Sequence, residues 1–591
     1  MKFTLSHRVS SNDAILETQS SESAAPRSFD RWLPWLLCAF VFAVLLYELG
    51  AAALFDPDEG RNSEKAREIL ALNDWVTPHE NFHVVLDKPI FFYWMIALSY
   101  KLFGISEWAA RLPSALAAFG CLALVFFFTR ERWGRWTALW STLILLTSIE
   151  FFSLARIVIF DMSLTFFLTL ALCAFYEAAH TEEARRRRMI CLAMYLALGA
   201  ATLIKGLIGV VVPGMVIFFY LWFSKQWAIL KRISLVPGAL VFLAMVLPWY
   251  LQAEARNAGY LRYYLWDEHF GRFASSMFRR SGPWYYFFPV VFVGFLPWSF
   301  LLPIVARKFW KDRLDDKSLF LILWVLLPFI FFSISKSKLP HYILPIFPAL
   351  AILTATALVS LYRNTESKMR LALSLAWLTQ SLAVLYLIVG SVFPVILSDP
   401  IREGVSRMPH FLWACGAALV LVFLYFALSN NQRLPKTHGQ LFLTHAVGLV
   451  LFFAFSVEVM VLIAPDRSAK PVAEKAMPLI SPATQVVFYE THLAGMPFYL
   501  RSERPIWLVT HENKKRTFLG NYYASVNKTN PISRWGDAIF EYEEFRDKWQ
   551  TTKQPLLIIV KEKNLWRLIA NVGESPKRLA EVDGYLLVTK Q

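Results

Sequence analysis

The stretch from Tyr342 to Ser360 reads YILPIFPALAILTATALVS, nineteen residues without a charged side chain. A run of this length and polarity can cross the hydrocarbon core of a bilayer as a helix. Comparable runs recur along the chain, so the sequence predicts a polytopic α-helical membrane protein with about thirteen transmembrane helices. The predicted spans lie at about residues 33–55, 108–128, 136–150, 160–180, 190–204, 207–223, 233–251, 286–306, 318–333, 342–360, 371–396, 411–428 and 439–463.

The overall composition supports this prediction. The 591 residues are 56% hydrophobic and 16% aromatic, and the mean hydropathy is +0.43. The net charge of +16 could indicate a nucleic-acid partner, but Lys and Arg gather in short links between the predicted spans, where they orient a membrane protein. We therefore expect membrane lipids, and no nucleic acid, around this chain.

The basic links also predict the topology. With the N-terminus inside the cell, each of six alternate links should be cytoplasmic, and each is rich in Lys or Arg. An odd number of spans then places the C-terminal tail outside. The six links are residues 130–135, 185–188, 225–232, 307–317, 363–370 and 433–436.

Three segments are predicted from this pattern. Residues 1–30 are polar and Ser-rich and are expected to form a disordered cytoplasmic tail, without a signal peptide. Residues 31–463 form the transmembrane domain. Residues 464–591 contain short β-type runs, at 485–489 and 556–560, and are predicted to form a small α/β domain outside the membrane. The five cysteines all fall in apolar runs and have neither metal-site nor disulfide spacing.

The outer loop at 56–107 carries the first candidate chemical groups. Its apolar residues Ala66, Ile69 and Leu70 share one helical face, opposite charged residues, which suggests a helix lying at the membrane interface. Before it stand the carboxylates Asp58 and Glu59. A carboxylate can activate an acceptor oxygen in group transfer. Solvated loop charges and helix caps are the alternative interpretation.

Cations of this loop and of other outer span ends complete the pattern. Arg61 and Lys88 could stabilise a departing anionic phosphate, and Lys205 and Lys338 lie at other outer span ends. Together they suggest an anion cradle, although a single Lys is more often a membrane anchor. Asp161 stands at an outer span mouth, where a charge needs water, a cation or a ligand; pairing with Arg156 is the structural alternative. No Gly-rich phosphate loop or zinc-hydrolase motif is present.

Several motifs in order resemble one family, the ArnT-type aminoarabinose transferases, which belong to the GT-C membrane glycosyltransferases together with the protein O-mannosyltransferases. The resemblance covers about residues 30–460. It rests on the runs at 58–64, 74–79, 87–94, 111–114, 202–206 and 336–345, on Arg156 with Asp161, and on Glu268-His269 with Arg272-Phe273. It departs from the family pattern at Asp87, where Glu is frequent, and at His341, where Thr is more usual.

The resemblance implies an inverting transferase of the bacterial inner membrane that uses a polyprenyl-phosphate sugar as donor. The donor would be undecaprenyl phosphate carrying a pentose, with aminoarabinose as the leading expectation, and the acceptor lipid A or another envelope glycoconjugate. Asp58 and Asp161 would be catalytic. The donor phosphate would be held by Arg61, Lys88, Lys205 and Arg272, and the pocket would include Glu59, His269, Lys338 and Tyr342.

No cofactor is expected, because cationic side chains suffice to stabilise a phosphate leaving group. A divalent metal bridging some of Glu59, His79, His83 and Asp87 is the less favoured alternative. Other functions also remain open. A protein or polysaccharide transferase of the same superfamily would share these motifs. A transporter or flippase would place its charges near the bilayer midplane and show paired halves, and an O-antigen ligase or polymerase is disfavoured by the Asp58-Glu59 loop.

Overall fold

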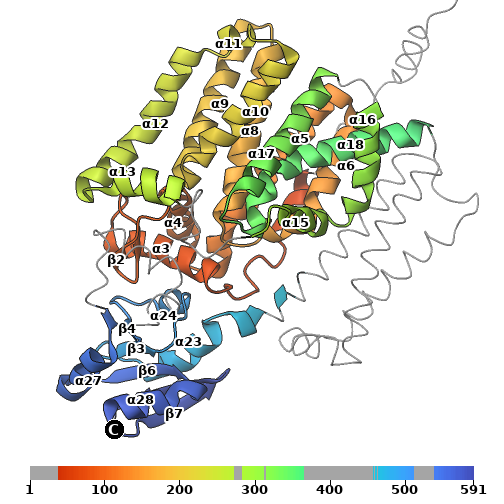
Figure 1. The fold of residues 1–591 in the computed structure, drawn as a ribbon. Coiled ribbons are helices and arrows are strands. Elements are labelled where there is room, and N and C mark those ends of the chain that lie inside the picture. The colour runs from red at the N-terminus through yellow and green to blue at the C-terminus, as the bar shows by residue number, and fades with distance from the viewer. Residues whose placement is uncertain are drawn as a thin grey trace, which may run out of the picture. The chain divides into compact units, whose positions relative to one another are not determined.

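The computed structural model describes residues 38–271, 282–311, 315–364, 457, 460–461, 464–511 and 538–590 (Figure 1). Six helical segments in this part of the chain are long and apolar enough to cross a membrane. They are α5 (Glu107–Trp133), α8 (Phe160–His180), α9 (Ala184–Lys205), α12 (Leu235–Arg256), α17 (Asp316–Ile334), and a segment of η3 (Pro340–Ile346) and α18 (Phe347–Asn364). They occupy predicted spans, and α8 has the predicted bounds.

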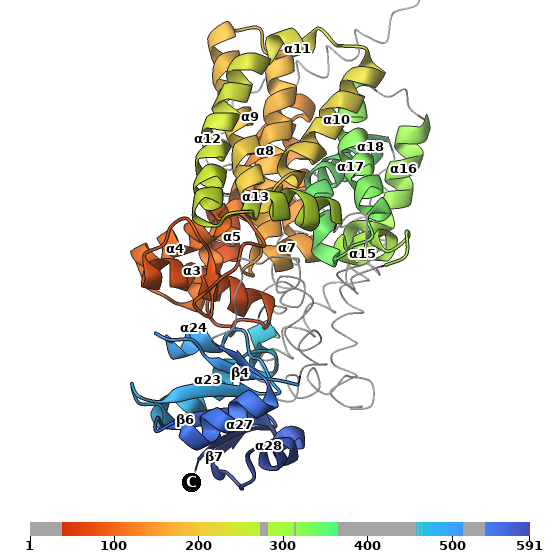
Figure 2. The same cartoon turned by 60° about the vertical axis from the view of Figure 1, so that its left-hand side comes forward.

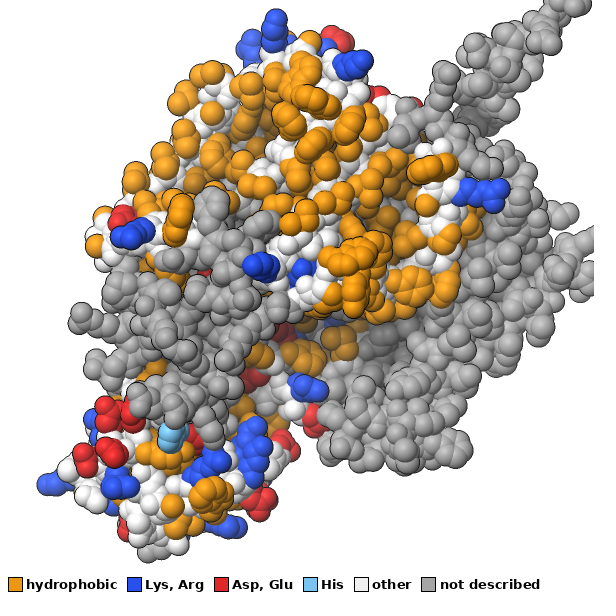
Figure 3. Space-filling view, viewed as in Figure 1, with side chains coloured by type: hydrophobic (Ala, Val, Ile, Leu, Met, Phe, Trp, Pro, Cys, Tyr) orange, Lys and Arg blue, Asp and Glu red, His pale blue; other side chains and the backbone are white. Residues whose placement is uncertain are grey.

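Shorter helices complete the described membrane part. Figure 2 shows α8, α9 and α12 running side by side. The predicted span 207–223 is α10 (Ile208–Ser224). The remaining short segments are α11 (Ile229–Arg232), α13 (Tyr260–Arg262) and the π-helical turn η1 (Tyr263–Gly271). Hydrophobic side chains cover this part on the face shown in Figure 3, whereas charged side chains gather over the C-terminal sheet region.

Two predicted spans are broken in the structure. Span 136–150 consists of α6 (Arg135–Leu146) and α7 (Ile149–Ala155), which meet at 68°. Span 286–306 consists of α15 (Phe287–Gly294), then η2 (Trp298–Leu301) and α16 (Leu302–Lys311), bent by 110°.

Each break has a local cause. The hydroxyls of Thr147 and Ser148 donate to carbonyls four residues earlier and compete with helix continuation, whereas Pro297 lacks the N–H that a continuing helix needs. The two breaks face each other, because the backbone N–H of Ile149 donates to the carbonyl of Leu296 at 3.2 Å.

Some predicted spans reach beyond the described residues. Of span 33–55, residues 38–46 are helical and residues 47–51 form turns. Spans 371–396 and 411–428 lie outside the described residues, as does nearly all of 439–463.

The outer loop forms α3 (Asp58–Leu72), a hairpin of β1 (His79–Glu80) and β2 (His83–Val84), and α4 (Phe91–Phe103). An amphipathic helix at an interface would leave its charged face in water. In α3 that face is buried instead: Glu64, Lys65 and Arg67 are at most 5% exposed. Arg67, for example, donates to the carbonyl of Ser502 in the C-terminal module.

The C-terminal module, residues 464–511 and 538–590 of the described chain, is an α/β sheet structure, as predicted. Its strands run in the order β5-β4-β3-β6-β8-β7. The first four are parallel, and β8 and β7 are antiparallel additions. The strands are β3 (Gln485–Tyr489), β4 (Trp507–Val509), β5 (Ile539–Phe540), β6 (Leu556–Lys561), β7 (Lys577–Val582) and β8 (Tyr585–Thr589).

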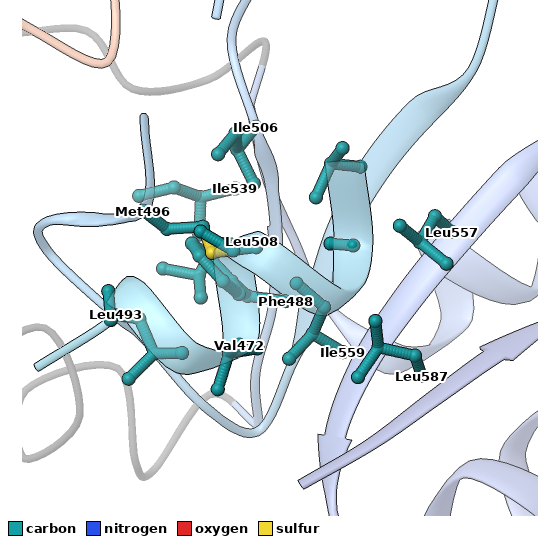
Figure 4. Close-up of a cluster of buried hydrophobic side chains, with 14 of the residues drawn as sticks. Val472, Phe488, Leu493, Met496, Ile506, Leu508, Ile539, Leu557, Ile559 and Leu587 are labelled. Atoms are coloured by element: carbon teal, nitrogen blue, oxygen red, sulfur yellow. The ribbon is translucent and has the colours of Figure 1, made fainter. Parts of the chain in front are cut away.

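Helices cover both faces of this sheet: α23 (Lys470–Ala476), α24 (Met496–Leu500), α27 (Tyr542–Thr551) and α28 (Leu565–Val572). Apolar side chains of successive strand residues point to opposite faces, so β3 contributes Phe488 to one core and Val487 to the other. Figure 4 shows the first core around Phe488, Met496 and Ile559. This core also contains Val85 of the outer loop, so the module and the loop share apolar packing.

Candidate active site

Side chains from four separate segments meet around a cavity of about 110 Å³. Lys88 precedes α4, Lys205 ends α9, Glu268 lies in η1, and Tyr342 lies in η3. Tyr264, Ser335 and Ser337 add polar atoms, and Ile208, Phe331 and Phe332 form an apolar wall. Three residues predicted from the sequence, Lys88, Lys205 and Tyr342, therefore lie at one cavity.

Asp161 stands behind Lys205. The Lys205 ammonium lies 2.5 Å from Oδ1 of Asp161, and Nε2 of His341 lies 3.7 Å from Oδ2. The same ammonium lies 4.2 Å from the ring centre of Tyr342. Antiparallel packing explains the meeting, because α8 and α9 are joined by a short link and the start of one helix adjoins the end of the other. Arg156, the alternative partner of Asp161, instead donates to the carbonyls of Leu45 and Tyr47.

Lys88 is held by a carboxylate that the sequence-based site did not include. Its ammonium lies 2.8 Å from Oε1 of Glu268 and donates to the carbonyl of Asp87 at 2.9 Å. The sequence contained a signal for Glu268, because it stands in the Glu268-His269 pair on which part of the family resemblance rests. From that pair, the sequence predicts only His269 as a pocket residue.

A chain of ion pairs leads from Arg61 toward this cavity. Arg61 contacts Glu80 at 3.1 Å, Glu80 contacts Lys65 at 3.2 Å, and Lys65 contacts Asp87 at 3.1 Å. Burial acts to raise the pKa of Asp87, but Lys65 and Lys88 outweigh it and hold this pKa below its ordinary value. Asp87 is therefore an anion, and Arg61 is coupled to Lys88 through buried charges.

The two acids of the Asp58-Glu59 pair have different surroundings. Asp58 is exposed at the start of α3. Glu59 is buried and accepts two hydrogen bonds from Arg111, at 2.9 and 2.8 Å. It also accepts from the backbone N–H groups of Phe55 and Val158. Glu59 thus connects α3 to α5 and to the segment before Asp161, and it is not among the described residues that line the cavity.

Lys338 borders a second, apolar cavity of about 530 Å³. Its ammonium donates to the carbonyls of Gly282 and Ser335. Along the segment from Ser335 to Lys338, the serines line the first cavity and the lysines line the second. The second cavity shares Phe288 and Phe329 with a larger apolar cavity of about 970 Å³.

Other predicted residues are not tested by this geometry. The side chain of His269 and the whole of Arg272 lie outside the described residues. Within the part of the chain that the structure describes, no three His, Cys, Asp or Glu side chains are grouped closely enough to hold a metal ion. The expectation that no cofactor is required stays a prediction.

The chain is similar to known proteins in both sequence and fold. Residues 87–251 match the family described as dolichyl-phosphate-mannose-protein mannosyltransferase. An undecaprenyl phosphate-α-4-amino-4-deoxy-L-arabinose arabinosyl transferase of Aeromonas salmonicida is 35% identical over 396 residues, which are 66% of this chain and 70% of that protein. The chain belongs to this arabinosyl transferase family. A Pseudomonas aeruginosa member is 34% identical over 338 residues, covering 56% of this chain and 61% of that protein.

A solved structure extends the likeness beyond the region aligned with those two members. The crystal structure of ArnT from Cupriavidus metallidurans bound to undecaprenyl phosphate is 26% identical and matches with a TM-score of 0.79. The match covers 94% of this chain and 98% of that one, so it includes the C-terminal module. Membership of the arabinosyl transferase family confirms the resemblance and the GT-C fold class, and this protein is a multi-pass membrane protein. The number of spans and the domain boundaries stay predictions.

Proposed function

We propose that this protein is a glycosyltransferase that moves 4-amino-4-deoxy-L-arabinose from undecaprenyl phosphate to lipid A or to another envelope acceptor. The main support for this proposal is the cavity that Lys88 and Lys205 line together. A carboxylate lies beside each of the two cations. Relatives named for this donor, and an ArnT crystallised with undecaprenyl phosphate, support the choice of donor.

The chemistry requires little beyond positioning and charge. The acceptor oxygen attacks the anomeric carbon of the sugar, and the bond from that carbon to the phosphate oxygen breaks. Undecaprenyl phosphate leaves with the bonding electron pair. The ammonium groups of Lys88 and Lys205 stabilise the negative charge that develops on this phosphate, in a site where burial strengthens the interaction. No nucleotide and no cofactor are required, because the sugar–phosphate bond is already activated.

The acids take separate roles in this proposal. Asp58 faces solvent at the start of α3 and serves the acceptor: it removes a proton from a hydroxyl acceptor, or orients a phosphate acceptor whose oxygen is already nucleophilic. Asp161 acts through Lys205, whose ammonium it holds beside Tyr342. Arg61 contributes positive charge through the ion-pair chain that ends at Asp87.

The apolar cavities suit the lipid part of the donor. The cavities of about 530 and 970 Å³ share Phe288 and Phe329 and are lined mainly by hydrophobic side chains. A polyprenyl chain is apolar along its whole length, so its burial there is favourable. In this arrangement the lipid-bearing phosphate lies next to Lys88 and Lys205.

The cellular arrangement is part of the proposal. The protein lies in the bacterial inner membrane with its N-terminus in the cytoplasm and its C-terminal module in the periplasm. The support is the distribution of Lys and Arg among the links. The transferred sugar then reaches acceptors on the periplasmic side.

A reconstituted assay tests the function. Purified protein is given the undecaprenyl phosphate-linked amino sugar with lipid A, and mass spectrometry follows both products. Lys88→Ala should lower kcat/KM for the donor by roughly a hundredfold or more. Lys101→Ala, on the exposed side of α4, should leave turnover unchanged. Absence of transfer by the wild-type protein to lipid A and to other envelope glycolipids would contradict the proposal.

A further inference from the structure

Ser337 brings a hydroxyl group to the cavity that Lys88 and Lys205 line. The residue is 7% exposed, and its Oγ makes no hydrogen bond with any residue that the structure describes. A buried hydroxyl without a partner costs free energy, because it has lost its bonds to water. A hydroxyl in this state at a cavity wall is a candidate contact for a ligand.

The neighbouring serine is already engaged, and it helps to hold Ser337 in place. Oγ of Ser335 donates to the carbonyl of Ser337 at 3.2 Å. The ammonium of Lys338 donates to the carbonyl of Ser335 and, at 3.0 Å, to that of Gly282. These bonds fix the backbone on both sides of Ser337, so its side chain is held at the cavity wall while its hydroxyl stays available to a ligand.

The place of Ser337 in the chain indicates which part of the donor it meets. Its neighbours Lys336 and Lys338 line the apolar cavity of about 530 Å³, whereas Ser337 lines the cavity that contains the two ammonium groups. In a polyprenyl-phosphate sugar, the phosphate joins the apolar chain to the polar head group. A donor with its lipid chain in the apolar cavity and its sugar in the other therefore has its phosphate near Ser337.

A hydroxyl donor suits a phosphate at this place. Hydrogen bonds from a neutral hydroxyl to an anionic oxygen are short and strong. The ammonium groups of Lys88 and Lys205 are each shared with a carboxylate. The Ser337 hydroxyl has no such competing acceptor among the described residues, so a bound phosphate gains the whole hydrogen bond.

We propose that Ser337 is a further catalytic residue, whose hydroxyl donates a hydrogen bond to the phosphate of the donor. The inference rests on the proposed function, because the polyprenyl-phosphate donor is taken from it. During transfer, the electron pair of the bond between the anomeric carbon and the oxygen moves onto the phosphate, while the hydroxyl keeps its proton. The hydrogen bond strengthens as this negative charge grows, so it lowers the barrier more than it tightens donor binding.

Thermal unfolding separates this role from a structural one. Ser337→Ala removes a hydroxyl that bonds no described residue, so without ligand its midpoint should be at least as high as that of the wild type. A lipid that binds the folded protein raises the midpoint. The rise with undecaprenyl phosphate should be smaller in Ser337→Ala, because its affinity falls on the order of tenfold. Undecaprenol, which has the same chain and no phosphate, should act equally on both proteins.

Steady-state kinetics with the sugar-bearing donor test the catalytic part of the inference. In Ser337→Ala, kcat should fall on the order of tenfold, whereas KM for the donor should change less, because the hydrogen bond is strongest to the leaving phosphate. Ser337→Thr keeps a hydroxyl on the same carbon and should retain more turnover than Ser337→Ala.

Ser114→Ala is the matched control. Ser114 of α5 is also buried, and its Oγ likewise has no partner among the described residues. It is not one of the described residues that line the three cavities. This variant should therefore match the wild type in turnover and in its response to undecaprenyl phosphate.

Two results would overturn the inference. One is a lower midpoint of ligand-free Ser337→Ala, which would indicate a structural serine. The other is a response to undecaprenyl phosphate, or a kcat, that is the same in Ser337→Ala as in Ser114→Ala. Failure of the proposed function is distinguishable, because the wild type would then bind undecaprenyl phosphate and transfer no sugar, while the binding comparison would still decide the role of Ser337.

Discussion

Gly60 of α3 and Gly495, which precedes α24, are in backbone contact. A Cβ atom on Gly60 would lie 2.5 Å from Cα of Gly495, closer than real side chains approach. The contact joins the helix that carries Asp58, Glu59 and Arg61 to the C-terminal module. A second contact reinforces it, because the Asn81 side chain bonds both the N–H and the carbonyl of Ile506, at 2.8 and 2.9 Å. The module is therefore part of the packing that positions α3.

The first prediction is that Gly60→Ala displaces α3. The added methyl group would lie 2.5 Å from Cα and 2.6 Å from the backbone nitrogen of Gly495, and overpacking of this kind costs about 1–3 kcal/mol. We expect a lower thermal midpoint and a lower kcat. Gly214→Ala is the control, since its Cβ would meet nothing within 4 Å. Equal behaviour of the two variants would show that the contact does not position α3.

The second prediction concerns Asp58. This side chain is exposed, so Asp58→Asn should leave the thermal midpoint of the purified protein unchanged. Turnover should fall on the order of 10²-fold or more if Asp58 is a general base. Single-turnover measurements with saturating donor and acceptor give the rate of the chemical step. Near-normal turnover would refute the catalytic role.

The third prediction is that the neighbouring acid behaves differently. Glu59→Gln leaves the buried Arg111 without its counter-charge, and breaking a buried pair costs about 3–5 kcal/mol. Thermal unfolding should detect this loss. The control is Glu131→Gln, which breaks a half-exposed pair with Arg186 at 3.8 Å worth about 0–1 kcal/mol. A midpoint for Glu59→Gln as high as that of the control would contradict the structural role.

The fourth prediction is a pH dependence that involves Asp56. Burial raises the pKa of Asp56 from 3.8 to about 7, although the backbone N–H of Gly495 and the charge of Arg61 oppose the shift. A raised carboxyl pKa stabilises the folded state below the ordinary pKa of 3.8, and this contribution is lost as pH rises through about 7. Asp56→Asn should therefore remove part of the fall in thermal midpoint between about pH 5 and pH 8.

His492 provides an internal contrast to that measurement. Burial lowers the pKa of His492 from 6.5 to about 4, so its contribution is lost as pH falls from 6.5 toward 4. The contribution of Asp56 to stability is lost as pH rises, whereas that of His492 is lost as pH falls. A midpoint profile above pH 6.5 that is the same in Asp56→Asn as in the wild type would exclude the assigned role of Asp56.

The fifth prediction is that chelators leave transfer unaffected, because Lys88 and Lys205 provide the positive charge beside the leaving phosphate. Turnover would be measured after prolonged treatment with a chelator and then after addition of single divalent ions. Loss of activity that one particular ion restores would show that a metal takes part.

Local patterns of sequence predicted much of this molecule. Apolar length predicted α8 to its terminal residues, and β-branched runs predicted β3 and β6. The meeting of Asp161 with Lys205 follows from antiparallel neighbours whose ends share one side of the membrane. These features depend on interactions between residues that are close in sequence, or on the order of the spans.

Features that depend on distant partners were not predictable. The charged face of α3 is buried partly by the rest of the outer loop, where Lys65 pairs with Glu80 and Asp87. The module buries another part, since Arg67 donates to the carbonyl of Ser502, 435 residues away. The sequence does not predict Glu268 as a site residue, because its contact with Lys88 joins positions that are 180 residues apart. Hydropathy does not reveal the breaks within spans 136–150 and 286–306, because a bend leaves the apolar composition of a span unchanged.

The segment from Ser335 to Lys338 borders both the cavity at Lys88 and Lys205 and the apolar cavity of about 530 Å³. Side chains of consecutive residues face opposite compartments, so a shift of its backbone moves both surfaces at once. Selectivity for the sugar-bearing head group and selectivity for the length or branching of the lipid chain are therefore mechanically linked. During evolution, a homologue that adapts to a different lipid carrier must readjust its head-group recognition as well.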